Sequence, residues 1–184
     1  MIPIFVPPSA AERLLSMKKA VALFLVIIIA LPVLSSCAGA KKAPSCLAVL
    51  EAMTRAEIGL PAGRVYSLSS SREDDGYLSE SLIKSLYGNG SLPPISHSWI
   101  DCAVFISTLG HPCEFAVAYC SDRNAAEDTA RLFNSRLKSV RALKFDEGCS
   151  AMLDGAQISI CGNFVIMIIS SDPSNALKTA RRLI

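Results

Sequence analysis

Cys37 stands in a sequence context that fits a defined chemical reaction. The apolar run 20–34 precedes it, broken only by Pro32, and the small residues Ser35 and Ser36 lie between that run and the cysteine. A thiol can act as a nucleophile and be alkylated to a stable thioether. Small residues let a peptidase approach the backbone on the N-terminal side. Cys37 thus has a side chain that can be alkylated and follows small residues that a peptidase can approach.

The segment before Cys37 is typical of a secretory signal. Lys18 and Lys19 come first, and the apolar run of 15 residues is shorter than the roughly 20 that a spanning helix needs. In addition, Leu34-Ser35-Ser36-Cys37 resembles the lipobox of bacterial lipoproteins. This resemblance implies that residues 1–36 are a lipoprotein signal peptide, that the bond between Ser36 and Cys37 is cleaved, and that a lipid attached at Cys37 anchors the protein to a membrane through its acyl chains. The alternative is an uncleaved membrane anchor with an incidental cysteine.

The boundaries of the remaining chain follow from this signal. Residues 1–16 have no role in it, so we expect the true start at Met17, the alternative being an unusually long charged region. Residues 37–44 then form a lipidated tether. Residues 45–184 form a single extracytoplasmic domain, which is long enough to bury an adequate core without disulfides or metals.

The charge balance excludes one class of partner. Without residues 1–36 the chain carries 15 basic and 15 acidic residues, and such a neutral balance gives no electrostatic footprint for nucleic acid. Only Lys41 and Lys42, next to the lipid, can contact anionic headgroups. The expected partners are the membrane, through the anchor at Cys37, and an unknown protein or small-molecule ligand.

Six cysteines follow Cys37 in the chain, and an even number outside the cytoplasm permits disulfides. They are Cys46, Cys102, Cys113, Cys120, Cys149 and Cys161. A hairpin whose paired positions sum to about 222 sets Cys102 opposite Cys120, which makes this pair a possible disulfide. The alternative is that all six are buried thiols used as small apolar residues. No Cys-x-x-Cys occurs, which argues against a thioredoxin-like redox site.

The sequence predicts no catalytic residue, metal site or cofactor. His97 and His111 do not combine with the cysteines into a known zinc-ligand spacing. There is no Gly-x-Ser-x-Gly segment and no glycine-rich phosphate loop. Nothing in the sequence brings two of the candidate acids together, namely Asp101, Glu114, Glu147 and Asp154. Asp122 and Asp172 fit better as helix caps.

The pattern of apolar residues predicts the elements that position these side chains. Helices are expected over 45–58 and 79–87, over 122–143 and from 172 onward, and a short strand over 64–68. Strands over 100–107 and 114–120 form one hairpin, and strands over 156–161 and 164–170 form another around Gly162-Asn163. The strands over 114–120 and 164–170 do not alternate polar and apolar residues, so we expect both of their faces to be covered.

The predicted fold is therefore an α+β domain. Two β-hairpin–helix units form a four-stranded antiparallel sheet, and two N-terminal helices precede it. The segments 121–133 and 171–183 align without gaps, which favours one unit used twice, the alternative being that capped amphipathic helices simply look alike. We expect the two long helices to cover one face of the sheet and the N-terminal helices part of the other.

Several segments of this domain occur in a familiar order. Tyr87-Gly88 precedes the first hairpin, Glu114 begins the second strand, an alanine-rich helix runs over 125–136 to an arginine region, and a Gly-Asn turn leads into the apolar strand at 162–170. In this order they resemble a family of uncharacterised, mostly Gram-positive bacterial lipoproteins that carry a domain of unknown function. The resemblance covers residues 46–184, although the six cysteines depart from the family pattern.

The resemblance implies an address and a domain type, and it implies no activity. We therefore expect a lipid-anchored protein on the extracytoplasmic face of the cell membrane, whose domain is a non-catalytic binding or accessory module of the cell envelope. The alternatives are an envelope hydrolase with a site on its loops and a lipoprotein that handles thiols or metals.

Overall fold

A five-stranded antiparallel sheet in the order β1-β2-β3-β5-β4 forms the middle layer of the part that the computed structural model describes, residues 43–108 and 110–184. Each pair of neighbouring strands is antiparallel. The strands are β1 (Gly63–Ser67), β2 (Trp99–Ser107), β3 (Glu114–Cys120), β4 (Gln157–Cys161) and β5 (Phe164–Ile169).

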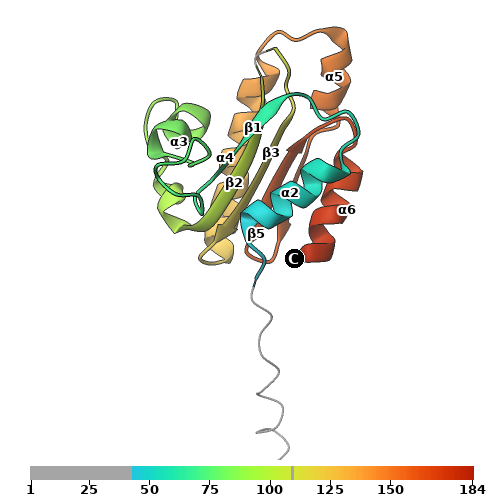
Figure 1. Cartoon of the computed structure of the whole chain (residues 1–184). Helices are drawn as coiled ribbons and strands as arrows, with labels where there is room; N and C mark the ends of the chain where they lie inside the picture. Colours follow the sequence, from blue (N-terminus) through green and yellow to red (C-terminus); the bar gives the residue numbers. More distant parts are fainter. Residues whose placement is uncertain (1–42, 109) are drawn as a thin grey trace, which may run out of the picture. The chain divides into compact units, whose positions relative to one another are not determined.

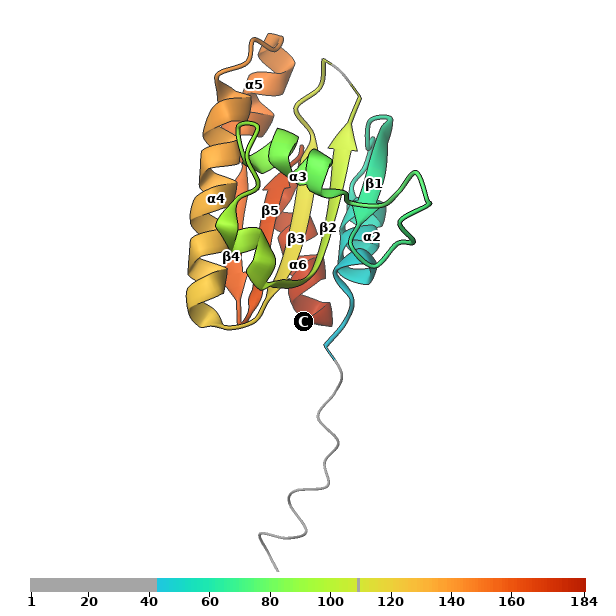
Figure 2. The same ribbon diagram turned by 90° about the vertical axis from the view of Figure 1, so that its left-hand side faces the viewer.

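Helices cover both faces of this sheet (Figures 1 and 2). The helices are α2 (Cys46–Ala56), α3 (Glu80–Tyr87), α4 (Arg123–Arg141), α5 (Glu147–Asp154) and α6 (Pro173–Leu183), with a 3-10 helix at Pro94–Ser98. One face carries α3 and α4, and the other carries α2 and α6. The result is three layers, with a separate hydrophobic core on each side of the sheet.

The central strands supply side chains to both cores. In β5, Val165, Met167 and Ile169 face α4, whereas the alternate residues Phe164, Ile166 and Ile168 face α2 and α6. All six are buried. This arrangement confirms the prediction that the non-alternating apolar strands are covered on both faces.

The predicted four-stranded sheet is wrong, because β1 adds a fifth strand. It pairs with β2 from Gly63 opposite Ser107 to Ser67 opposite Ala103. The sheet therefore begins between the two N-terminal helices instead of after them. A strand was expected near here, but β1 is a short edge strand whose first residues are exposed, so its apolar pattern is too weak to place it in the sheet.

The expected distribution of the helices is also wrong. The two long helices α4 and α6 lie on opposite faces, and each shares its face with one N-terminal helix. The two similar segments 121–133 and 171–183 therefore begin alike and pack differently. The residue pattern of a strand that is apolar on both faces does not predict which face a following helix covers. The faces of α4 and α6 therefore could not be predicted from the strands.

The local starts of the helices match the sequence expectations. Asp122 caps α4 by accepting a bond from the amide N–H of Ala125 at 2.9 Å, and Asp172 caps α6 through Asn175 at 3.0 Å. Helix α5 was missed, because Gly148 within it reads as a loop residue. Its cap is Asp146, which accepts from the amide of Cys149.

The predicted signal peptide, residues 1–36, and Cys37 lie outside the described residues. Signal cleavage after Ser36 and lipidation of Cys37 therefore stay predictions. In the described part of the chain, every helix is too short or too polar to cross a bilayer.

Candidate functional site

A pocket of about 670 Å³ lies at the end of the sheet where β2 leaves toward β3. We call it the α3–α4 pocket, because the facing sides of these helices form its walls above the sheet. Its lining includes six large apolar side chains, namely Leu82, Leu86, Ile106, Val140, Leu143 and Phe145. The volume falls in the range of about 300–1,000 Å³ that is usual for small-molecule sites.

Helical spacing places the apolar side chains of each wall on one side of its helix. Leu82 and Leu86 are four residues apart on α3 and therefore project from the same face of that helix. Val140 lies in the inward stripe of α4, and Leu143 follows just after the helix ends. Leu143 is 59% exposed although it is a leucine, so the pocket has an apolar rim that solvent reaches.

A buried ion pair forms part of the pocket wall. Glu114, the first residue of β3, accepts bonds from Arg136 of α4: Arg136 Nε lies 3.2 Å from Oε1 and 3.1 Å from Oε2, and Nη2 lies 2.7 Å from Oε2. The side chains are 3% and 18% exposed, respectively. Burial lowers the pKa of Arg136, but the hydrogen bonds and charge of Glu114 outweigh this and raise it above its ordinary value. Two nitrogens of the guanidinium thus make charge-assisted hydrogen bonds to the carboxylate, at a position largely shielded from solvent.

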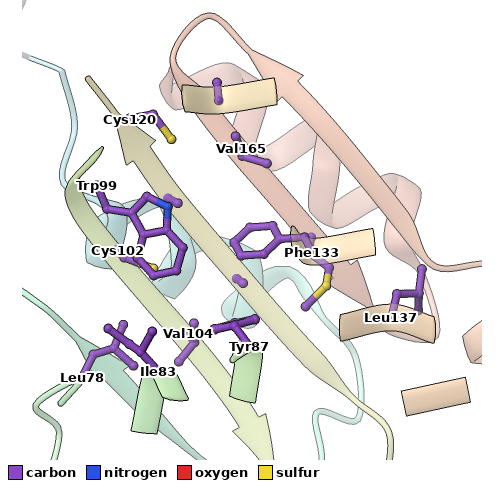
Figure 3. Packing of buried hydrophobic residues seen from close by; sticks show 14 of the residues in the cluster. Leu78, Ile83, Tyr87, Trp99, Cys102, Val104, Cys120, Phe133, Leu137 and Val165 are labelled. Carbon is purple, nitrogen blue, oxygen red and sulfur yellow. The ribbon is translucent and has the colours of Figure 1, made fainter. Parts of the chain in front are cut away.

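Tyr87, the last residue of α3, packs among aromatic side chains of the same core. Its ring packs at 6.1 Å from the ring of Trp99 and at 5.5 Å from that of Phe133, and Figure 3 shows the three side chains meeting. Its buried hydroxyl finds no hydrogen-bond partner among the described residues. Burial raises the pKa of Tyr87, and the negative charge of Glu114 raises it further.

The two histidines do not converge. His97 lies in the 3-10 helix before β2, and His111 lies in the loop after it, so the nine-residue strand separates them. The imidazole Nδ1 of His111 accepts a bond from the amide of Cys113 at 3.2 Å, and the hydroxyl of Ser107 donates to the carbonyl of His111 instead of to its ring. In the described part of the chain, no hydroxyl or carboxylate is hydrogen-bonded to either imidazole, as a hydrolase would need.

The cysteines of the domain are buried, apart from the half-buried Cys161, and none is bonded to another. The geometry that suggested a disulfide does not occur: Cys102 lies opposite Ala118, and Cys120 lies opposite Trp99. Burial raises the pKa of Cys102 well above its usual value and that of Cys113 to about 12. Such thiols are poor nucleophiles and poor metal ligands, and residues 43–108 and 110–184 hold no cluster of three potential metal ligands.

Sequence reasoning named Glu114 and Arg136 separately and missed their pairing. Two signals were present. Glu114 is a charged residue inside an otherwise apolar strand, and Arg136 follows Phe133 by three and precedes Val140 by four, which places it beside the inward stripe of α4. A buried acid and an inward-facing arginine are expected to find each other, because an unpaired buried charge costs several kcal/mol.

This arrangement can hold a ligand with an apolar body beside a polar group that the wall can bond. It brings together no nucleophile and base of the kind that the catalytic alternatives need. Comparison of the chain with family models, curated proteins and solved structures found no match. The functional argument therefore depends on the chemistry of the pocket and of the N-terminal sequence.

Proposed function

We propose that this chain is a lipid-anchored protein of the extracytoplasmic face of the cell membrane, whose domain binds a ligand in the α3–α4 pocket without transforming it. One observation carries the binding part: an apolar cavity of about 670 Å³ whose wall contains the buried pair Glu114–Arg136. Mostly apolar pockets with a few fixed polar groups are the usual form of small-molecule sites. The resemblance of the sequence to envelope lipoproteins supports the address.

The position of the pocket suits an anchored binding module. The amide of Cys46, the first residue of α2, donates to Asp101 near the start of β2 at 2.7 Å, whereas the pocket lies beyond Ile106 at the end of that strand. At about 3.4 Å per residue, these two ends of β2 are about 17 Å apart. A chain that enters this unit at α2 therefore enters at the end away from the pocket.

The address is tested on the mature N-terminus. The protein is extracted from bacterial membranes and its N-terminal peptide is analysed by mass spectrometry. We expect a chain that begins at Cys37 and carries an added diacylglycerol mass, and we expect Cys37→Ser to lose both the added mass and the membrane fractionation. An unmodified Cys37 that still follows residues 1–36 overturns this part of the proposal.

The binding part is tested with a neutral apolar dye, N-phenyl-1-naphthylamine, whose fluorescence rises in a dry site. We expect saturable binding to the intact chain and at least about tenfold weaker binding to Leu86→Trp, since the larger side chain fills the pocket. The matched control is Ile100→Trp, which alters an exposed apolar residue at the far end of β2. Equal binding by the two variants, or no saturable binding at all, overturns the binding proposal.

A further inference from the structure

The charges that line the α3–α4 pocket do not cancel. Two arginines and one glutamate line it, namely Arg64, Arg136 and Glu114. Glu114 is paired with Arg136, and Arg64, an exposed residue at the start of β1, forms no ion pair within the described residues. The pocket therefore keeps about one unit of positive charge that no acidic side chain of its lining balances.

Arg136, the arginine of the buried pair, also has N–H donors that Glu114 does not use. A guanidinium carries five N–H groups, and Glu114 takes bonds from Nε and Nη2 of Arg136 only. Within the described residues, Nη1 makes no hydrogen bond. Because Arg136 lines the pocket, these N–H groups are available to an oxygen of a bound ligand. Glu114 meanwhile fixes the guanidinium in place, so little side-chain freedom is lost when the ligand binds.

Most of the other side chains of the lining are apolar, beside the polar Ser107, Thr108 and His111, and the apolar part extends to the surface. Leu82 and Leu86 on one side face Val140 and Phe145 on the other, and Leu143 lies exposed at the rim. A ligand that is only charged would leave these walls wet, and a ligand that is only apolar would leave the positive charge without a counterpart. The complementary molecule has one apolar body and one anionic group.

We propose that the α3–α4 pocket binds a monoanionic amphiphile, a molecule with a single apolar chain that ends in a carboxylate. This inference depends on the proposed binding function and names the class of its ligand. A carboxylate fits better than a phosphate monoester, because one unbalanced positive charge matches one negative charge and leaves the second charge of a phosphate without a partner. The planar carboxylate also suits the flat guanidinium.

The experiment compares ligands that share one chain and differ in the head. Dodecanoate, dodecanol, dodecyltrimethylammonium and dodecyl phosphate displace the neutral dye from the full chain, each below its micelle concentration. We expect dodecanoate to bind about tenfold more tightly than dodecanol, the ammonium compound to bind most weakly, and the preference for dodecanoate to fall with added salt.

Two arginine variants locate the charge. In Arg64→Gln we expect the preference for dodecanoate over dodecanol to fall to about twofold or less. The matched control Arg131→Gln removes the same charge from an exposed pair with Asp128, outside the pocket lining, and is expected to keep the preference.

The outcomes separate this inference from the proposed function. If dodecanol displaces the dye as well as dodecanoate, or if both arginine variants act alike, the ligand class is wrong and the binding function stands. Tighter binding of dodecyl phosphate overturns the choice of a carboxylate. If none of the four compounds binds and the dye itself does not saturate, the binding function fails together with the inference.

Discussion

The ion pair between Glu114 and Arg136 makes an asymmetric prediction about stability. In Arg136→Met, the carboxylate of Glu114 stays buried, at 3% exposure, and loses three hydrogen bonds at once. Breaking a buried pair in this way is expected to lower the free energy of unfolding by about 3–5 kcal/mol. In Glu114→Gln, the amide oxygen still accepts a bond, and the arginine that remains is 18% exposed, so the expected loss is about 1–3 kcal/mol.

The double variant tests whether the two residues act as one unit. With both charges gone, the loss is expected to be smaller than the sum of the single losses by at least about 1 kcal/mol. Urea unfolding of the purified chain measures each value. The fluorescence of Trp99, the single tryptophan, reports the transition, since Trp99 is buried against Tyr87 near the pair.

An exposed pair on the same helix provides the control. Arg131 pairs with Asp128, and their side chains are 72% and 47% exposed, so Arg131→Met is expected to cost no more than about 1 kcal/mol. If Arg136→Met costs as little as Arg131→Met, the pair is not a buried unit and the reasoning about the pocket wall is wrong.

Three further predictions use other parts of the structure. Tyr87→Phe is expected to be neutral or stabilising by up to about 2 kcal/mol in urea unfolding, because the buried hydroxyl has no hydrogen-bond partner among the described residues. A loss above about 1 kcal/mol would show that the hydroxyl is bonded. Asp122→Asn is expected to reduce the loss of stability in acid. The hydrogen bond from the amide of Ala125, and after it the one from Ser121, lowers the pKa of Asp122. The stability that the ionised Asp122 contributes is therefore present above about pH 4 and disappears as the pH falls through the lowered pKa. Urea midpoints at neutral and acid pH measure this, and an unchanged pH dependence contradicts it. Among the six cysteines of the domain, a thiol reagent is expected to label Cys161 first, because the other five are buried. Mass spectrometry identifies the labelled site. If the Cys161→Ser variant is labelled as fast as the unchanged chain, the described packing of the cysteines is contradicted.

The features that sequence reasoning placed correctly depend on a few neighbouring residues. At Asp122 and Asp172, an aspartate accepts the amide N–H three positions on and thereby caps the start of a helix. Gly162 adopts a positive φ of 60° in the hairpin turn that was expected there. Such signals are complete within about four residues, so they can be interpreted before the fold is known.

The features that it missed depend on distant residues. A strand was expected over 64–68, but its place in the sheet depends on the open edge of β2, because its own sequence, Gly63 to Ser67, carries little apolar pattern. The faces chosen by α4 and α6 depend on how two cores fill at once, since β3 and β5 are apolar on both sides. Glu114 and Arg136 are 22 positions apart, and only the packing of α4 onto the sheet joins them.

The buried pair makes a prediction about proteins related to this chain. Glu114 and Arg136 are far apart in the sequence, and the carboxylate of Glu114 holds the guanidinium of Arg136 in the pocket wall. A relative that lacks the glutamate is therefore expected to lack the arginine as well, because either charge left alone in this wall costs several kcal/mol. An alignment of relatives in which the two residues vary independently would contradict this expectation and leave the ion pair as a feature of this chain alone.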